Sequence, residues 1–150
     1  MLAQSGVTES GCLFCRIASG DAPAQVVLAE PDVVAFLDIR PLFPGHTLVV
    51  PRRHVETLGE LPPDLVEPLF AATRRLTLAV EAAVAADGSF VAVNNRVSQS
   101  VPHLHVHVVP RKFKDGLRGF MWPRHRYADD DAMAATADAI RAALVGTLGS

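Results

Sequence analysis

The chain has 150 residues, of which 49% are hydrophobic and 20% charged, a balance typical of one globular domain that buries its own core. A net charge of −2 argues against a general nucleic-acid-binding surface, which needs an excess of Lys and Arg to neutralise phosphates. No apolar run approaches the ~20 residues that span a bilayer, and residues 1–10 lack the pattern of a signal peptide. We therefore expect a cytoplasmic protein without a membrane partner.

The first half of the chain predicts a short helix followed by three strands. Residues 1–10 are expected to be disordered, and the helix to run over 12–19, because Gly20 can close it as a C-cap. The strands are β-rich runs bounded by proline and glycine, and the first two are close enough to form a hairpin. The expected strands are 26–30, 33–38 and 47–50.

The second half predicts a long helix, two strands and a final helix. Apolar residues recur at helical spacing over 64–86, and Asp87-Gly88 is expected to end that helix. Strands follow at 89–95 and 103–109. Three aspartates at 129–131 suit the start of the last helix, because its dipole is positive there. Strands joined by short turns predict an antiparallel sheet with the helices on one face, within a single α+β domain over 1–150.

Three histidines alternate with apolar residues over 103–108, the most informative segment of the chain. Side chains alternate across a strand, so the histidines share one face and the apolar residues face the core. Each imidazole is a potential base, nucleophile or metal ligand. The pattern by itself also allows three solvated histidines, or a catalytic zinc held by them. The three are His103, His105 and His107.

Residues 99–110, Gln-Ser-Val-Pro-His-Leu-His-Val-His-Val-Val-Pro, resemble the signature of the histidine-triad (HIT) family. Further segments resemble the family's motifs in the same order: Cys-Leu-Phe-Cys-Arg-Ile at 12–17, Phe-Leu-Asp-Ile-Arg-Pro at 36–41 and Gly-His-Thr-Leu-Val-Val-Pro at 45–51. The resemblance covers about residues 12–127 and is to the bacterial, Hint-like branch. It implies a HIT-like fold, with an antiparallel sheet of about five strands, a long central helix and a C-terminal helix.

The resemblance implies an enzyme that acts at the α-phosphorus of a purine nucleotide, either a nucleoside phosphoramidate or a dinucleoside polyphosphate. His105 would attack phosphorus and form a nucleotidyl-histidine that water hydrolyses. His107 would contact the phosphate or the leaving group, and His46 would support the triad. No catalytic metal is expected, because nearby donors can stabilise the phosphoryl oxygens. The alternatives are a nucleotide-binding sensor or partner protein with little turnover, and a hydrolase with zinc on the triad.

The same resemblance implies a substrate-binding set around the histidines. Asp38 would hydrogen-bond the ribose, and Ser100 and Asn94 would contact the phosphate, helped by the main chain of Gln99 to Val101. Each of these residues is also an ordinary turn or capping residue. The apolar residues that match the family's base pocket, and that would otherwise be core, are Leu13, Phe14, Ile17 and Phe36.

The loop before the Gln-Ser pair departs from the family pattern. Ser98 stands where the family usually has glycine, and the loop before it is shortened to Arg96-Val97. Because this loop should lie beside the phosphate and the leaving group, the leaving-group preference stays open. Arg96 is a candidate contact to a substrate phosphate.

Cys12 and Cys15 form the chain's single Cys-x-x-Cys, a spacing typical of zinc sites but also of redox pairs. Two inert thiols are a further alternative. The HIT resemblance implies a structural zinc completed by His54, after the Val-Val-Pro strand, and by His103, the first triad histidine. Such a site would tie the N-terminal helix to the sheet without supplying the nucleophile.

The basic and aromatic segment 111–124 is expected to be either a lid over the leaving group or a loop docked on a dimer partner. A lid would use Arg118, Trp122 or Arg124, whereas His125 is expected at the surface. The resemblance also implies a twofold homodimer through the long central helix and its neighbouring strand.

Overall fold

The computed structural model describes residues 11–117 and 123–147. The chain divides into two compact units between Asp115 and Gly116, and each is described here by itself. The expected disorder at 1–10 and the lid residues Arg118 and Trp122 lie outside the described residues. The expectation of a single domain stays a prediction. Within the described ranges, no helix combines the length and the apolar character that crossing a membrane requires.

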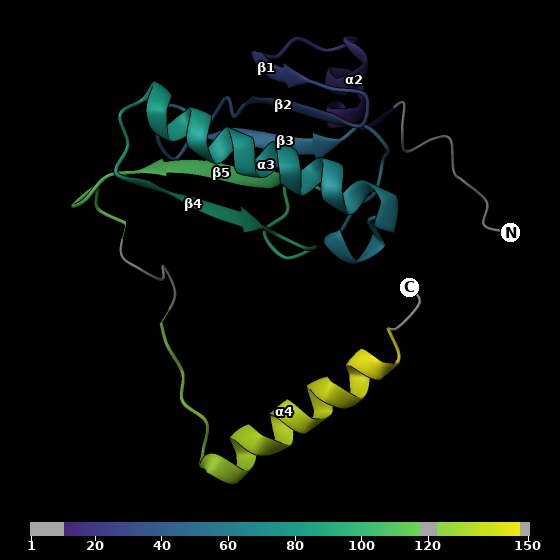
Figure 1. Ribbon diagram of the computed structural model, residues 1–150, viewed down its shortest axis with the longest axis vertical. Coiled ribbons are helices and arrows are strands. Elements are labelled where there is room, and N and C mark those ends of the chain that lie inside the picture. Colours follow the sequence, from purple (N-terminus) through teal and green to yellow (C-terminus); the bar gives the residue numbers. More distant parts are fainter. Residues whose placement is uncertain (1–10, 118–122, 148–150) are drawn as a thin grey trace, which may run out of the picture. The chain divides into compact units, whose positions relative to one another are not determined.

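The first unit contains a five-stranded antiparallel sheet (Figure 1). Each strand pairs antiparallel with its neighbours, which confirms the predicted α+β fold with a sheet of about five strands. The hairpin expected near the N-terminus is the pair β1 and β2. The order in the sheet is β1 (Val26–Ala29), β2 (Val33–Leu37), β3 (Thr47–Pro51), β5 (Val106–Arg111) and β4 (Gly88–Val93).

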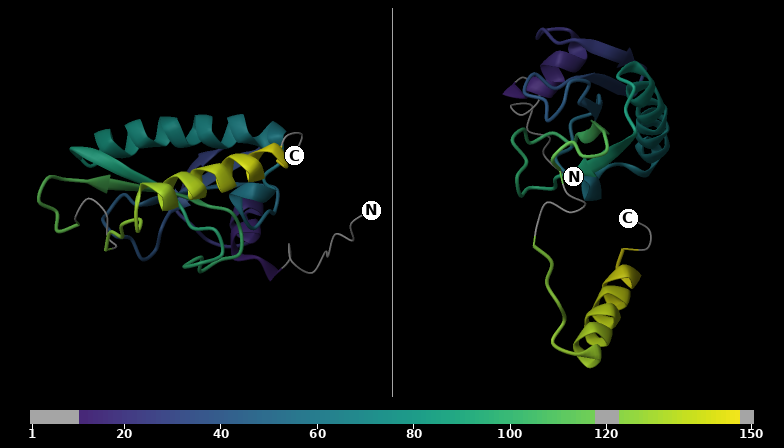
Figure 2. Two further views of the ribbon diagram at one scale, coloured as in Figure 1. Left: turned by 90° about the horizontal axis from the view of Figure 1, so that it is seen from below. Right: turned by 90° about the vertical axis from the view of Figure 1, so that its left-hand side faces the viewer.

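The two helices of this unit pack on opposite faces of the sheet, so the expectation that helices cover one face is wrong (Figure 2). Helix α3 (Pro63–Ala83) packs against Val33, Ala35 and Val49. Helix α2 (Leu13–Ser19) packs against the residues that alternate with these along β2 and β3 and so lie on the other face: Val34, Phe36, Leu48 and Val50. The physical reason is that β2 and β3 are apolar at consecutive positions, so both of their faces must be covered.

Helix α3 ends earlier than the sequence predicts. It begins after Pro62, with Pro63 in its first turn, and ends at Ala83. The left-handed residue that follows is Ala85, with φ 51°, whereas Gly88 already opens β4. The Asp87 N–H donates to the Arg111 carbonyl at 2.9 Å. Residue 87, where the helix was expected to end, is therefore already hydrogen-bonded to β5.

Strand β5 begins at Val106, three residues later than predicted. Before it, the Leu104 N–H donates to the Val55 carbonyl at 2.7 Å, outside the sheet ladder. The predicted alternation nevertheless holds, because Leu104, Val106 and Val108 are fully buried in the core beneath α3. His105 and His107 therefore face the opposite side, where α2 lies.

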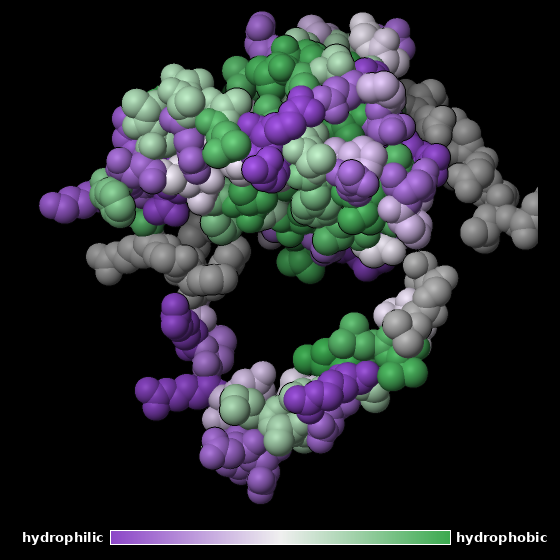
Figure 3. All heavy atoms as spheres, viewed as in Figure 1, coloured by the Kyte–Doolittle hydropathy of each residue, from purple (hydrophilic) through white to green (hydrophobic). Residues whose placement is uncertain are grey.

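Helix α4 (Asp130–Val145) belongs to the second unit and begins where the three aspartates predict it. Asp129 caps it by accepting from the Ala132 N–H at 2.7 Å. None of its residues is buried, and Figure 3 shows apolar side chains along it. The large ones are Met133, Ile140, Leu144 and Val145.

Candidate active site

Three histidines meet on the α2 face of the sheet: His107 lies in β5, and His105 and His46 directly precede β5 and β3. Leu48 of β3 pairs with His107 of β5, so His46, two residues before Leu48, lies on the same face as His107. The rings of His46 and His107 have centroids 5.2 Å apart, and those of His105 and His107 are 4.8 Å apart. His46 and His105 are buried, and His107 is half-buried.

Hydrogen bonds from the main chain assign the proton on each of these rings. The Leu42 N–H donates to His46 Nδ1 at 3.1 Å, so the neutral His46 ring carries its proton on Nε2. This Nε2–H then donates to His107 Nδ1 at 2.9 Å. His107 must consequently carry its own proton on Nε2, a buried atom without a hydrogen-bond partner among the described residues. A buried N–H group is thus available to a ligand.

His105 has the opposite arrangement. Its Nδ1–H donates to the carbonyl oxygen of His103 at 2.7 Å, which leaves a lone pair on Nε2. The edge-on ring of Phe14, from α2, lies 5.1 Å from the His105 ring and restricts its rotation. The site therefore combines a nucleophilic nitrogen on His105 with a hydrogen-bond donor on His107.

Burial keeps the rings of His46 and His107 neutral. It lowers the pKa of His107 to about 4, assisted by the neighbouring His105 and His46 and opposed by Asp38. Burial also lowers the pKa of His46, again with Asp38 acting in the other direction. At neutral pH the rings of His46 and His107 therefore each carry one proton, as the hydrogen bond between them requires.

Asp38 follows β2 and has one oxygen oriented toward the histidines. Its Oδ1 accepts from the Arg40 N–H at 2.8 Å, which fixes the carboxylate in a tight turn. Its Oδ2 lies 3.8 Å from His46 Nε2. One carboxylate oxygen is therefore held by the chain, and the other lies beside the histidine group.

The residues expected to contact the phosphate lie around the ends of β4 and β5. Asn94 directly follows β4, and the pairing of Val93 with Val106 places Asn94 at the position opposite His105. Ser100 is exposed and lines a hollow of about 390 Å³ together with Val101 and Leu13. Gln99 differs, because both ends of its side-chain amide bind the protein's own chain.

The residues expected to form a base pocket divide into two kinds. Phe14, Ile17 and Phe36 are at least nine-tenths buried, and the Phe14 and Phe36 rings are 5.2 Å apart. Leu13 is 45% exposed. The first three therefore form the core beneath α2, and Phe14 also contacts the ring of His105, whereas Leu13 has the most exposed side chain of the four.

Four side chains from three segments form a candidate metal site next to the histidines. The ligand atoms of Cys12, Cys15, His54 and His103 all lie within 4.8 Å of one another. His103 Nδ1 is 3.4 Å from Cys12 Sγ and 3.5 Å from Cys15 Sγ, and His54 Nδ1 is 3.4 Å from Cys15 Sγ. Tetrahedral coordination at the usual Zn–S and Zn–N bond lengths separates sulfur from nitrogen by about 3.5 Å.

The donor chemistry also fits a metal. The His103 Nε2–H donates to the Pro51 carbonyl at 2.8 Å, which leaves the Nδ1 lone pair facing both sulfurs. One lone pair cannot accept two thiol hydrogens well, whereas a metal ion binds all three atoms at once. Burial, opposed by the Pro51 contact, lowers the pKa of His103 to about 4, which keeps the ring neutral as a ligand must be.

A second group of potential ligands fits a metal less well. Asp38, His46 and His107 also have ligand atoms within 4.8 Å of one another. The Leu42 N–H occupies His46 Nδ1, however, so the Nε2 that faces the group carries a proton and has no lone pair for a metal. The tautomers therefore favour proton chemistry here and metal binding at the Cys–His group.

Several contacts at the site have no signal in the sequence. The donors and acceptors that orient His46, His103 and His105 are main-chain groups of Leu42, Pro51 and His103. The contact of Phe14 with His105 depends on how α2 lies on the sheet.

Two arginines that are candidate substrate contacts, Arg96 and Arg124, are exposed, and so is His125. Arg96 lies 3.5 Å from Glu60.

Comparison with known proteins gives concordant matches over most of the chain. A family model described as HIT domain matches residues 19–114. A HIT-like protein of Mycobacterium tuberculosis is 37% identical over 138 residues, covering 89% of this chain and 92% of its own. A solved structure from Streptococcus mutans is 36% identical with a TM-score of 0.84, covering 94% of this chain and 90% of that one.

Other matches have more specific descriptions. A structure described as a Zn-bound histidine triad family protein from Mycobacterium smegmatis is 36% identical, with a TM-score of 0.69, covering 89% of this chain and 99% of that one. An adenosine 5'-monophosphoramidase of Candida albicans is 29% identical over 122 residues, 77% of this chain and 80% of its own. An asymmetrical bis(5'-nucleosyl)-tetraphosphatase of Schizosaccharomyces pombe is 39% identical over 94 residues, 61% of this chain and 52% of its own.

Proposed function

We propose, since this chain belongs to the HIT domain family, that it is a nucleotide hydrolase acting at the α-phosphorus of a purine nucleotide through a covalent nucleotidyl-histidine. The relatives named above include a phosphoramidase and a tetraphosphatase, which supports a nucleoside phosphoramidate or a dinucleoside polyphosphate as the substrate class.

One observation carries the proposal: a lone pair and an N–H group lie side by side on adjacent rings. The Nε2 lone pair of His105 attacks phosphorus, a P–N bond forms, and the bond from phosphorus to the leaving group breaks. The leaving group departs with the bonding electrons and takes a proton from water. The Nε2–H of His107 hydrogen-bonds a phosphoryl oxygen or the leaving atom, where negative charge develops.

The second step regenerates the ring. Water attacks phosphorus, the P–N bond breaks, and a nucleoside monophosphate is released. Throughout, the His103 carbonyl accepts a hydrogen bond from His105 Nδ1–H, so it stabilises the positive charge that the ring gains as a nucleotidyl-imidazole.

The rest of the site is assigned by position. Asp38 holds the ribose, Asn94, Ser100 and the main chain of Gln99 to Val101 hold the phosphate, and His46 orients His107. The base lies against Leu13 and the exposed edges of Phe14, Ile17 and Phe36. We further propose a structural zinc on Cys12, Cys15, His54 and His103, and a twofold homodimer; the zinc would organise α2 without taking part in the reaction.

The experiment measures turnover of a fluorogenic adenosine phosphoramidate and a diadenosine polyphosphate by wild type, His105→Ala and His105→Gly. We expect both variants to lose at least about 10³-fold in kcat, because the covalent route is closed. Mass spectrometry of wild type quenched in an alkaline denaturant, where the P–N bond is stable, should detect an adenylyl group on the peptide that contains His105. His125→Ala, at an exposed histidine, is the matched control and should keep wild-type turnover.

Other results would point elsewhere. Retained turnover in the His105 variants would exclude the covalent mechanism. Tight AMP binding without turnover in wild type would favour the nucleotide-binding sensor or partner. Immediate inhibition by a chelator, at a temperature where the fold persists, would favour a catalytic metal.

A further inference from the structure

The loop between β4 and β5 approaches Ser100 in an unfavourable backbone conformation. Arg96 and Ser98 both have left-handed φ values, 67° and 60°, although neither is glycine. Non-glycine residues adopt this conformation at a cost, and two so close together persist only where surrounding contacts impose it. The contacts that hold this loop are therefore of interest.

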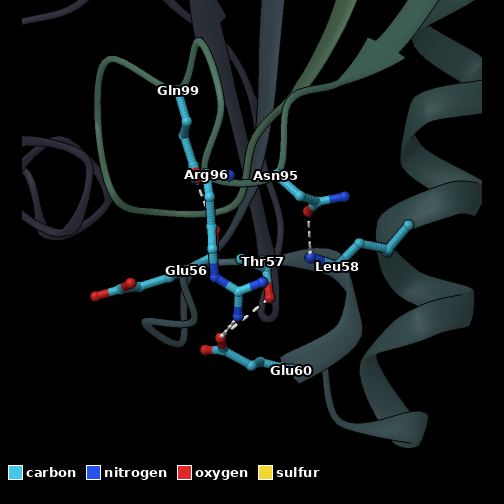
Figure 4. Close-up of polar contacts among 7 residues, drawn as sticks. All are labelled: Glu56, Thr57, Leu58, Glu60, Asn95, Arg96 and Gln99. Atoms are coloured by element: carbon cyan, nitrogen blue, oxygen red, sulfur yellow. Dashed lines mark hydrogen bonds and ion pairs between the residues drawn. The ribbon is translucent and has the colours of Figure 1, made fainter.

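Three ties hold the loop against the segment from Glu56 to Glu60 (Figure 4). In the first, the Gln99 Nε2–H donates to the Glu56 carbonyl at 2.7 Å, while the oxygen of the same amide accepts from the Arg96 N–H within the loop at 2.8 Å. The Asn95 Oδ1 accepts from the Leu58 N–H at 2.9 Å. The third tie is an exposed ion pair of Arg96 with Glu60 at 3.5 Å.

The segment that receives these ties is itself firmly placed. Thr57 is 3% exposed, and its hydroxyl donates to Glu60 Oε1 at 3.1 Å. The Val55 carbonyl accepts from the Leu104 N–H at 2.7 Å, next to His105. The loop is thus held by a segment that is hydrogen-bonded to Leu104, the residue directly before His105.

We propose that Gln99 and Asn95 are positioning residues, which hold the 95–99 loop so that Ser100 and the adjacent N–H groups are preorganised for the phosphate. This inference rests on the proposed function, because it needs a phosphate at Ser100. The side chain of Gln99 acts on the protein's own chain, since both ends of its amide are already engaged there. Preorganised donors of this kind lower the barrier because they need no rearrangement as charge develops.

The first test follows the loop without any substrate. Hydrogen–deuterium exchange of the amides at 95–101 should be at least about tenfold faster in Gln99→Ala and Asn95→Ala than in wild type, because the strained loop relaxes. Amides within α3 should keep their wild-type rates. Glu60→Gln is the matched control, since it retains the oxygen that accepts from Thr57 and removes only the exposed charge. It should leave exchange unchanged.

The second test separates positioning from direct contact. With an adenosine phosphoramidate, Gln99→Ala should lower kcat about 10–100-fold and change KM less than about threefold, because the donors matter most in the transition state. In a Ser100→Ala background the same change should cost less than about threefold, since residues that act as a unit are not additive. Gln99→Glu makes the contact with the Glu56 carbonyl repulsive and should behave like Gln99→Ala.

The outcomes distinguish this inference from the proposed function. Wild-type exchange at 95–101 in Gln99→Ala would overturn the positioning role. So would an undiminished loss in the Ser100→Ala background together with a raised KM, because that pattern indicates contact with the substrate. If wild type has no turnover, the proposed function fails, and the exchange rates alone decide whether Gln99 and Asn95 hold the loop.

Discussion

At the scale of single residues, main-chain groups determine what each histidine can do. The imidazole is chemically the same at positions 46, 103, 105 and 107, yet each ring meets a different partner. A main-chain N–H at His46 makes Nδ1 an acceptor, and a main-chain carbonyl at His105 makes Nδ1 a donor. The opposite nitrogens therefore differ as well: His46 offers a proton to His107, and His105 offers a lone pair.

The lowered pKa of His107 predicts a pH-dependent stability. In the unfolded chain this ring takes a proton below its ordinary pKa of 6.5, whereas in the folded protein it does so only near 4. The stabilising contribution of this neutral ring to the free energy of unfolding is thus complete above pH 6.5 and is lost as the pH falls toward 4. We expect the free energy of unfolding to fall by about 2 kcal/mol more in wild type than in His107→Gln over that range.

Chemical denaturation at a series of pH values measures this difference. Contributions that the two proteins share, including that of His103, cancel in the comparison. His125→Gln, at an exposed position, serves as the control and should follow wild type. Parallel pH profiles for wild type and His107→Gln would contradict the burial of a neutral ring.

At the scale of elements, helix α2 links the Cys–His group to the nucleophile. Cys12 caps this seven-residue helix and Cys15 lies in its first turn, so a metal would grip its N-terminal end. At the other end, Arg52 Nη1 donates to the Ala18 carbonyl at 2.6 Å. Between them, Phe14 lies against the rings of both His103 and His105. Because so short a helix is not stable alone, these contacts hold it in place.

Removal of the proposed zinc should therefore destabilise α2 first. We expect Cys15→Ser to lower the free energy of unfolding by about 2–4 kcal/mol, and a chelator to lower it similarly in wild type only. Turnover should fall less than in His105→Ala, since the proposed zinc would act only through Phe14 and His103. The measurements are zinc content of the purified protein and thermal unfolding with and without chelator. The zinc site would be contradicted if purified wild type contains no metal and its unfolding temperature changes with neither chelator nor added zinc.

At the scale of the whole molecule, the β4 edge of the sheet and the exposed apolar residues of β4 and α3 are the candidate surface for a homodimer. Strand β4 is an edge strand, and an exposed edge can pair with another chain. Within this strand Val91 is 44% exposed, and α3 exposes Phe70 at 39% and Leu78 at 58%. These residues support the proposed homodimer through α3 and β4. Helix α4, which has no buried residue, adds another apolar surface in the second unit.

A double substitution tests this arrangement. Phe70→Lys with Val91→Lys should shift the protein from dimer to monomer in sedimentation velocity, because two charges would be buried in the interface. Val27→Lys, at the equally exposed position of β1 on the opposite edge, should remain dimeric. A monomeric wild type, or dissociation only in Val27→Lys, would contradict the proposed interface.

The sequence by itself determined the fold class, the family and most of the elements. The family came from the resemblance of the motifs, whereas local patterns are sufficient for the elements. Alternation over 103–108 predicted which apolar side chains enter the core, and Gly20 and Asp129 marked helix ends because their capping chemistry is local. The motifs also indicated which cysteines and histidines to group, and the structure brings Cys12, Cys15, His54 and His103 together.

Only the tertiary structure decided the chemistry of the individual groups. The end of α3 and the start of β5 depend on main-chain hydrogen bonds between distant segments, and so do the tautomers of the histidines. The sequence predicts a phosphate contact for the main chain of Gln99, and only the fold shows that the side-chain amide joins Arg96 to Glu56. A residue's type states which hydrogen bonds it can make, but its partners come from elsewhere in the chain, and they determine which of those bonds remain for a ligand.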